Sequence, residues 1–441
     1  MGEDREFVLK LARSNNVKFI RLWFTDILGF LKSYAITIEE LEDALAEGVR
    51  FDGSTTLGFI RSAEREAIAL PDPSTFKILP WRPKEDSVAR MFCDIYSSDG
   101  KRYEGDSRYV LKRNLERAAE KQFTFYTGPE IEFFFFKNSQ TPEILDRGGY
   151  YDLTPLDVAT DFRRQMVLNL EEMGIGVISS HHEGAYSQHE IDLRHEDALA
   201  TADNIMSFKH VAKEIGHRNG IYTTFMPKPL ADQNGSGMHI HMSLFKGESN
   251  IFFDKKDPHH LSKNAKHFIA GLLKHCNEFF AVTNQWVNSY KRLIFGFESP
   301  THISWGYGDY TDLVRVPQCR EDKSSSARIE LRNPDSAINP YLVFSAILAS
   351  GLKGIDEQYE LPDPVELRQP LRSRRDIQKM GLVPVPADLH EAVQHLERSA
   401  LMRETLGDFV VDRIVENKIL EIEKYNAYIT DYEINEYFPV L

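Results

Sequence analysis

The sequence contains few cysteines. Cys93, Cys276 and Cys319 are the three among 441 residues, and they lie far apart without Cys-x-x-Cys spacing. This spacing excludes a disulfide framework and a cysteine-based zinc site, and it is typical of proteins in a reducing cytosol. We therefore expect a cytoplasmic protein.

Long apolar runs are also missing. No run approaches the roughly 20 residues that a helix needs to cross a bilayer, and the N-terminus, Met-Gly-Glu-Asp-Arg-Glu, has no signal-peptide pattern. We therefore expect no association with a membrane.

Positive charge is scarce as well. The chain has 53 Lys and Arg residues against 67 Asp and Glu residues, a net charge of −14. Such a balance disfavours nucleic acid as a partner. An anionic substrate would need local cations, supplied by metal ions or converging arginines.

The length is greater than that of one ordinary domain and suggests about two or three. Residues 1–104 predict a small α+β domain, with a helix over 3–14, strands over 17–25 and 31–36, and a helix over 37–48. Residues 105–441 predict a larger domain of strands and amphipathic helices, opened by a helix from Asp106. Its expected strands are 122–136, 175–180, 219–226, 237–245 and 326–332, and its expected helices are 156–173, 196–217, 262–280 and 338–353. Asp388-Leu389-His390-Glu391 predicts a capping box that opens a C-terminal helix.

One expected strand carries two carboxylates. In Thr127-Gly128-Pro129-Glu130-Ile131-Glu132-Phe133-Phe134-Phe135-Phe136, the aromatic run favours a strand. Alternation then puts Glu130 and Glu132 on one face. Two neighbouring carboxylates on an apolar strand repel each other and resist burial unless cations lie beside them. A half-exposed strand with a polar face in water is the alternative interpretation.

Three later stretches could supply matching groups. Glu183 and Glu190 lie seven residues apart around a Gly- and Ser-containing loop, and His239, His241 and Ser243 share one strand face. The run Arg328-Ile329-Glu330-Leu331-Arg332 puts Arg, Glu and Arg on one face. Each stretch alone also fits an ordinary structural role, such as a hydrogen-bonded histidine or an ion-pair ladder. Together they offer carboxylates and a histidine, a donor set that suits Mg²⁺ or Mn²⁺ better than zinc.

Eight motifs in order resemble the type I glutamine synthetases of bacteria and archaea, over essentially the whole chain. They begin at Phe51-Asp52-Gly53-Ser54, Glu130-Ile131-Glu132, His182-Glu183, Phe225-Met226-Pro227, Asn234-Gly235-Ser236, Asn288-Ser289-Tyr290, Arg328-Ile329-Glu330 and Asn339-Pro340-Tyr341. The resemblance implies an α+β fold, in which a β-grasp-like N-terminal domain precedes a catalytic domain with a curved antiparallel sheet flanked by helices. It also implies phosphorylation of the glutamate γ-carboxylate by ATP, displacement of phosphate by ammonia, and assembly as a homododecamer.

The resemblance further implies roles for individual residues. Two or three Mg²⁺ or Mn²⁺ ions per site are expected, the first held by Glu132, Glu183 and Glu190 and the second by Glu130, His239 and Glu330. The residues expected to hold glutamate are Asn234, Gly235, His239, Arg292 and Arg332. Those expected on the nucleotide side are His241, Ser243 and Arg328, with Arg315 facing the phosphates. Asp52 of a neighbouring subunit, Glu183, Tyr150 and the flap residue Glu298 are expected to form the ammonium pocket. Arg61 matches an arginine used for glutamine feedback.

Two positions depart from the family pattern. Tyr310 stands where a phosphate-facing arginine is usual, and Tyr186 adds bulk to a loop where the family prefers Val, Pro and Gly. Losing one cation from a phosphoryl-transfer site costs roughly 10²–10³-fold in rate. Arg320 is a possible substitute for the missing cation. Besides an ammonia ligase, these departures leave open a γ-glutamyl ligase for a larger amine such as a polyamine, and a weakly active homologue that binds glutamate or nucleotide and regulates a partner.

Overall fold

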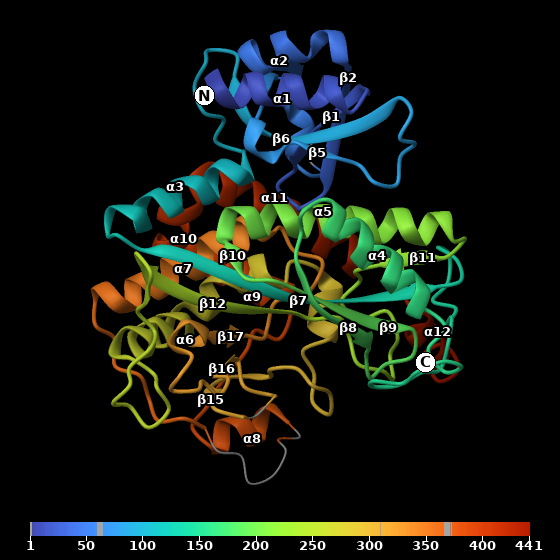
Figure 1. Ribbon diagram of the computed structural model, residues 1–441. Helices are drawn as coiled ribbons and strands as arrows, with labels where there is room; N and C mark the ends of the chain where they lie inside the picture. The colour runs from blue at the N-terminus through green and yellow to red at the C-terminus, as the bar shows by residue number, and fades with distance from the viewer. Residues whose placement is uncertain (1, 60–64, 309, 366–370, 372) are drawn as a thin grey trace.

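The structure is a computed structural model that describes residues 2–59, 65–308, 310–365, 371 and 373–441. A small N-terminal part lies on one side of a larger part that contains a long curved sheet (Figure 1). The predicted fold class is confirmed.

The small part is one sheet covered by two helices. Its elements are α1 (Gly2–Ser14), β1 (Val17–Thr25), β2 (Leu31–Thr37), η1 (Ile38–Glu40), α2 (Leu41–Glu47), β3 (Val49–Asp52), η2 (Gly53–Thr56), β4 (Glu66–Pro71), η3 (Pro73–Thr75), β5 (Lys77–Ile78) and β6 (Ser87–Ser97). The strand order is β2-β1-β6-β4-β3, with β5 beside β6, and β1 runs parallel to β6. Apolar side chains of α1 and α2 pack on Ile20 of β1 and Met91 of β6. The helix expected over 37–48 begins as a 3-10 turn.

The larger part is built around a sheet in the order β15-β16-β17-β12-β7-β9-β8. Its strands are β7 (Thr124–Phe136), β8 (Val177–His182), β9 (Gln188–Leu193), β10 (Glu196–Asp197), β11 (Tyr222–Thr224), β12 (Met238–Lys246), β13 (Ser249–Asn250), β15 (Trp305–Gly306), β16 (Val314–Arg315) and β17 (Ile329–Leu331). All of its pairs are antiparallel except β15 with β16, so the sheet is mixed at that edge. A separate pair is formed by β14 (His302–Ile303) and β18 (Val383–Pro384). The expected strands over 219–226 and 326–332 are confirmed but shorter than predicted.

Helices flank this sheet. They are α3 (Ser107–Glu120), α4 (Thr160–Glu172), α5 (Ala198–Arg218), α6 (Lys263–Thr283), η4 (Val287–Lys291), η5 (Ser324–Ser326), α7 (Pro340–Asp356), α8 (Arg374–Lys379), α9 (Leu389–Arg398), α10 (Ala400–Leu406), α11 (Asp408–Asn426) and α12 (Asp431–Glu436). Asp388 caps α9 by accepting from Glu391 N (2.8 Å), but Glu391 accepts from Ala387 N instead of closing the predicted box. Within the described residues, no helix is both long and apolar enough to cross a membrane.

Strand β7 separates the core from the polar face of the sheet. Ile131, Phe133 and Phe135 are fully buried, and the Phe133 and Phe135 rings meet Phe208 of α5 and Phe162 of α4. Glu130 and Glu132 project to the opposite face, as the alternation of a strand requires. The same strand therefore anchors the helices and presents carboxylates.

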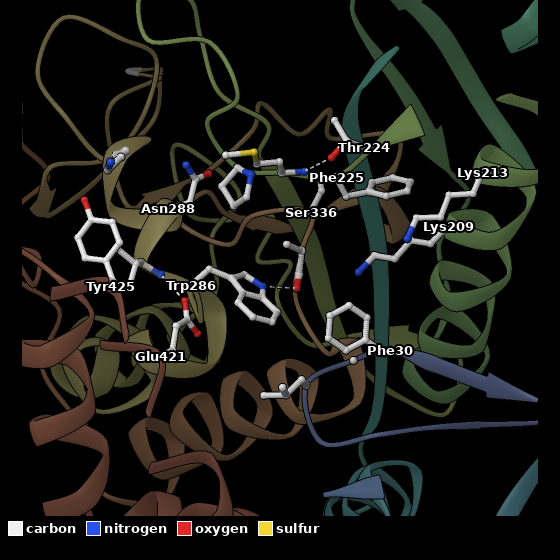
Figure 2. A pocket seen from close by; sticks show the side chains of 17 residues that line it. Phe30, Lys209, Lys213, Thr224, Phe225, Trp286, Asn288, Ser336, Glu421 and Tyr425 are labelled. Carbon is white, nitrogen blue, oxygen red and sulfur yellow. Dashed lines mark hydrogen bonds between the residues drawn. The ribbon is translucent and has the colours of Figure 1, made fainter. Parts of the chain in front are cut away.

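The β1–β2 turn inserts into the larger part. Gln285 donates to Leu28 O (2.9 Å), and Asn339 donates to Asp26 O (3.1 Å). Gly29 has a φ of +84°, and a Cβ there would lie 2.8 Å from Ile338 O, so only glycine fits this close approach. A mostly apolar cavity opens beside the turn (Figure 2).

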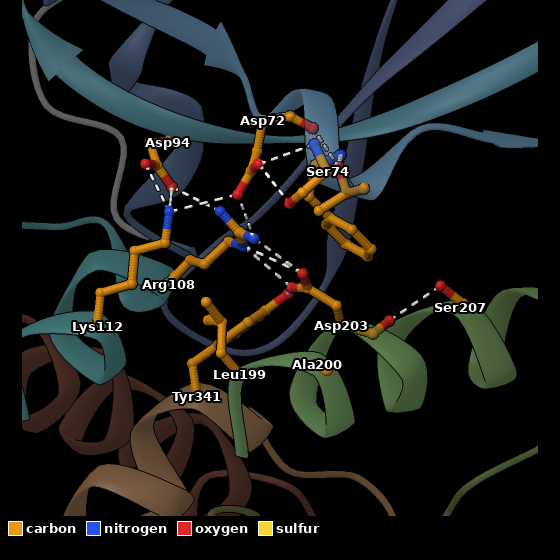
Figure 3. Close-up of polar contacts among 12 residues, drawn as sticks. Asp72, Ser74, Asp94, Arg108, Lys112, Leu199, Ala200, Asp203, Ser207 and Tyr341 are labelled. Carbon is orange, nitrogen blue, oxygen red and sulfur yellow. Dashed lines mark hydrogen bonds and ion pairs between the residues drawn. The ribbon is translucent and has the colours of Figure 1, made fainter. Parts of the chain in front are cut away.

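A buried arginine joins the two parts. Arg108 of α3 reaches Asp94 of β6 (2.7 Å), Asp72 beside η3 (2.9 Å) and Asp203 of α5 (2.9 Å), as Figure 3 shows. Tyr341 of α7 donates to Asp203 (2.7 Å). Burial alone would raise the pKa of Asp94, but the charges of Arg108 and Lys112 lower it to about 2. We call these residues the Arg108 cluster; it fixes the small part onto three helices of the larger one.

Removing the arginine should leave two buried carboxylates short of a partner. We expect Arg108→Met to lower the free energy of unfolding by about 3–5 kcal/mol. The control Lys121→Met removes the exposed Lys121–Asp356 pair (2.7 Å), and it should cost less than about 1 kcal/mol. Urea unfolding at equal protein concentration measures both, and equal midpoints for the two variants would contradict a role for the cluster in joining the parts.

Candidate active site

Strand pairing sets carboxylates against one another. Glu132 lies opposite Glu190 across β7 and β9, and Glu130 lies opposite Asp192. On the other side of β7, His239 lies opposite Glu130, and His241 lies opposite Glu330 of β17. Like charges opposite each other destabilise a sheet unless cations neutralise them.

These groups line an acidic cavity of about 470 Å³. The predicted residues on its wall are Glu130, Glu132, Tyr150, Glu183, Glu190, Asn234, Gly235, His239, Glu298, Arg315 and Arg332. The structure thus brings together eleven of the residues that were assigned roles from the sequence, and Tyr310 lies on the same wall.

Three groups of side chains on this face could hold a metal ion, each with ligand atoms within 4.8 Å of one another. They are Glu130, Glu190 and His239; Glu130, His241 and Glu330; and His181, Glu183 and Glu190. The grouping differs from the two sets expected by resemblance, because His181 and His241 join and Glu132 stands apart. A fourth group, Asp146, His182 and His189, lies deeper. There Arg163 donates to His189 Nδ1 (2.8 Å), which leaves that atom unsuited to a cation.

The carboxylates repel one another strongly. Burial, and then the charge of Glu183, raises the pKa of Glu132 to about 8. Burial and the charge of Glu132 likewise raise the pKa of Glu190. For Glu130, burial alone would raise the pKa, but hydrogen bonds with His239 (3.1 Å) and His241 (2.6 Å) lower it. A face rich in hard oxygen donors, with acids that resist ionisation, fits Mg²⁺ or Mn²⁺.

Glu330 is held by arginines. Its side chain is fully buried, and its two oxygens bind Arg315 and Arg332. Burial alone would raise its pKa, whereas the charges of His241 and Arg332 lower it. The sequence left two roles open for Glu330, as a member of an ion-pair ladder or as a metal ligand. The two arginines and a metal ion would therefore compete for the same carboxylate.

A second cavity of about 520 Å³ adjoins the acidic cavity on the same face of β7 and contains all three residues expected on the nucleotide side: His241, Ser243 and Arg328. Arg328 Nε donates to His241 Nδ1 (3.2 Å). Glu130 and Asp192 line both cavities and so form their common wall.

Besides the fully buried Glu330 and the three residues of the second cavity, Arg292 and Asp52 are not among the described residues that line the acidic cavity. Arg292 is buried beneath it and donates to the carbonyls of Asn333 (2.9 Å) and Arg332 (3.2 Å). Its Nε has no hydrogen-bond partner within the described part of the chain. Asp52 is not among the described residues that line this cavity, and it accepts from Ser54 N and Oγ (both 2.9 Å).

The two residues that depart from the family pattern lie in different places. Tyr310 lines the acidic cavity, with its ring 5.3 Å from Arg315 Cζ and 5.4 Å from Arg332 Cζ. Arg320, the possible substitute, instead pairs with Asp322 (2.7 Å) and is not among the described residues lining either cavity. Tyr186 is also not among the described lining residues. Arg61 lies outside the described residues.

Sequence reasoning missed several residues of the wall. Asp192 stands two positions after Glu190 on β9, so the alternation that paired Glu130 with Glu132 could have found it. His181 binds Glu183 (3.1 Å), and its ring lies 4.7 Å from that of Tyr151. No signal in the sequence indicated Tyr151, because it depends on how the loop before α4 folds back onto β8.

Comparisons with known proteins agree over the whole chain. Residues 16–98 match the family described as glutamine synthetase, beta-Grasp domain, and residues 104–437 match glutamine synthetase, catalytic domain. A protein named glutamine synthetase from Mycolicibacterium smegmatis is 48% identical over 446 residues and covers 100% of each chain. A protein of the same name from Methanosarcina mazei is 45% identical, covering 99% of this chain and 98% of its own.

Solved structures share the fold. One titled as a GmaS/ADP complex has a TM-score of 0.86 at 29% identity and covers 98% of this chain and 99% of its own. The glutamine synthetase of Plasmodium falciparum has a TM-score of 0.87 at 24% identity, covers 99% and 98%, and shows the common fold. By these matches and by its site, the chain belongs to the glutamine synthetase family.

Proposed function

We propose that this protein forms glutamine, ADP and phosphate from glutamate, ammonia and ATP through γ-glutamyl phosphate. Family membership over the full length supports ATP-dependent glutamine formation. The observation that carries the proposal is the common wall of Glu130 and Asp192, because a phosphoryl group can pass across it from a nucleotide in one cavity to a substrate in the other.

Divalent cations would be held by carboxylate and histidine side chains on and beside this wall. Glu132, Glu183 and Glu190 are proposed for one Mg²⁺ or Mn²⁺ ion, and Glu130, His239 and Glu330 for the second; a third ion per site is possible. When bound, such ions neutralise charge on the transferring phosphoryl oxygens.

The side chains of the protein supply the other requirements. Arg315 and Arg332 carry fixed positive charge at the acidic cavity and would stabilise charge developing on the phosphoryl group. Asn234, Gly235 and His239 would orient glutamate. Arg292 would join them when the substrate carboxylate reorients its buried guanidinium. His241, Ser243 and Arg328 would bind ATP.

Ammonium must lose a proton before its nitrogen can attack. We assign that proton to Glu183 and to Asp52 of a neighbouring subunit, with Tyr150 and Glu298 closing the pocket. This assignment requires self-association, since a chain's own Asp52 is not among the described residues of its cavity, and we propose that the assembly is a homododecamer. We further propose that the two domains meet near residue 104, which is supported by the family matches ending at 98 and beginning at 104. A cytoplasmic location suits the use of ATP.

A larger amine is the second candidate acceptor. Tyr150, Tyr151 and Tyr310 line the acidic cavity together with Glu183 and Glu298. Aromatic rings beside carboxylates suit an organic ammonium group, whose charge can make cation–π contacts while its carbon atoms pack on the rings.

The acceptor can be tested directly. Purified protein is incubated with ATP, Mg²⁺ and glutamate, the amine is varied from ammonium to putrescine and spermidine, and phosphate and product mass are followed. We expect phosphate release with ammonium alone and a product with the mass of glutamine. Release only with the organic amines would instead support the second candidate. Silence with every amine, despite measurable ATP binding, would contradict both and leave a regulatory homologue.

Metal binding should release protons. Because the pKa of Glu132 is about 8, this side chain is mostly protonated at pH 7, and Mg²⁺ must displace the proton. We expect Mg²⁺ affinity to rise from pH 6 to pH 8, with about one to two protons released per site at pH 7 and fewer at pH 9. Calorimetry in buffers of different ionisation enthalpy counts them.

Matched variants locate the titrating group. Glu132→Gln should weaken Mg²⁺ binding and reduce the proton count, whereas Glu143→Gln, which removes an exposed pair with Lys137, should change neither. A proton count that stays the same at pH 9 or in Glu132→Gln would count against this assignment.

The missing arginine can be restored. Arg332 Nε binds the carbonyl of Tyr310 (3.0 Å), a contact that any side chain at this position keeps. We expect Tyr310→Arg to raise kcat with ammonium by about 10–100-fold, because it adds positive charge at the phosphoryl group. Tyr310→Phe, the control, should leave the rate within about twofold. An unchanged rate in Tyr310→Arg would mean that charge at this position does not limit turnover.

A further inference from the structure

The cavity beside the β1–β2 turn has no part in the proposed function. It encloses about 570 Å³ between that turn, η4, α5 and α11. Figure 2 shows the rings of Phe30, Phe225 and Trp286 around it. Its size and its mostly apolar lining are those of a small-molecule site.

Three lysines line this apolar cavity without a carboxylate partner. Lys213 and Lys291 form no hydrogen bond or ion pair with the residues that the structure describes, and each lies near an aromatic ring, Phe225 and Tyr425 respectively. Lys209 donates to Ile338 O (2.8 Å) and likewise has no ion pair within the described ranges. Unpaired lysines grouped together are unexpected in a chain with a net charge of −14.

The acid on the cavity wall is already engaged. Glu421 accepts from Val287 N (2.9 Å) and pairs with Lys418 (3.0 Å). The ammonium groups of Lys209 and Lys213 both lie 6.0 Å from the centroid of the Phe225 ring, and the charge of Lys213 acts on Lys209. An anion bound beside the two lysines would relieve this repulsion. Burial, and then the charge of Lys213, lowers the pKa of Lys209 to about 7, which a bound anion would reverse.

We propose that this cavity is a ligand site for a small organic carboxylate with an apolar body. The carboxylate lies between Lys209 and Lys213, with Lys291 adding positive charge at the rim, and the body packs against Phe30, Phe225 and Trp286.

The site is linked to the acidic cavity by hydrogen bonds. Ser336, on the wall of the ligand site, donates to Gly237 O (2.7 Å), and Gly237 N donates to Glu132 (2.9 Å). The wall also includes Asn288, which binds Lys228 N (2.7 Å) at the base of the loop that leads to Asn234. A ligand that shifts Ser336 or Asn288 will alter glutamate binding, a consequence that rests on the proposed function.

Binding is tested first, without ATP, glutamate or metal, so that it stands or falls independently of ligase activity. The probe is 3-phenylpropionate, and its neutral amide is the control, measured by calorimetry on the assembled protein at constant ionic strength. We expect saturable binding of one carboxylate per chain and at least about tenfold weaker binding of the amide. Absence of saturable binding, or equal binding of the amide, would overturn the proposal.

Variants then locate the probe. Lys213 and Lys291 are exposed and form no ion pair with the described residues, so Lys213→Gln and Lys291→Gln should fold normally. Each should weaken binding about three- to tenfold, while Lys10→Gln, an exposed lysine on α1, should not. Unchanged affinity in both variants would exclude this cavity as the site.

Coupling is measured by repeating the titration with saturating glutamate and Mg²⁺. Because linkage is reciprocal, we expect the affinity for the probe to change by at least about threefold. An identical affinity in the presence of glutamate would remove the connection between the two sites.

Discussion

Mutual repulsion among carboxylates is the constraint on which the catalytic half of this protein depends. Glu132 faces Glu190, and Glu130 faces Asp192, across two adjacent strands. These pairs do not stabilise the sheet, because like charges in cross-strand positions oppose strand pairing. The Phe133 and Phe135 rings, packed on α4 and α5, hold the strands together against that repulsion. The apolar face of β7 thus sustains a polar face that is poised to receive cations.

The common wall would let two adjacent cavities serve the proposed reaction. Both cavities lie on one face of β7, at alternate positions along the strand, so side chains and not the backbone divide them. Glu130 and Asp192 have this position between the nucleotide-side residues and the acidic cavity. In the structure, Arg315 and Arg332 are paired with Glu330. Ligands that compete for these arginines therefore also free a carboxylate, which couples substrate binding to the charge balance of the site.

Local patterns in the sequence predicted the elements well, whereas long-range pairing was beyond them. Alternation indicated Glu130 and Glu132 because a strand has a period of two residues, and Asp106 correctly marked the start of α3, where its side chain accepts from Arg108 N (3.0 Å). Alternation from Glu190 would also have indicated Asp192, but that Asp192 lies opposite Glu130 depends on the register between β7 and β9, which no local signal encodes. Arg292 was expected at the substrate from its motif, but packing turns its guanidinium toward backbone carbonyls. Tyr310, a departure visible in the sequence, proved to line the cavity.

The Arg108 cluster also bears on the order in which the chain is made. Its members, Asp72, Asp94, Arg108, Asp203 and Tyr341, emerge from the ribosome far apart in time. The small N-terminal part can form its own sheet early, since domains tend to fold as they are synthesised. Its two carboxylates stay exposed to solvent until α3 appears, and Arg108 lacks its strongest partner until α5 follows. Because Tyr341 of α7 also belongs to the cluster, the interface is complete only once about three quarters of the chain, 341 of 441 residues, has been translated, so the N-terminal part can fold well before it docks.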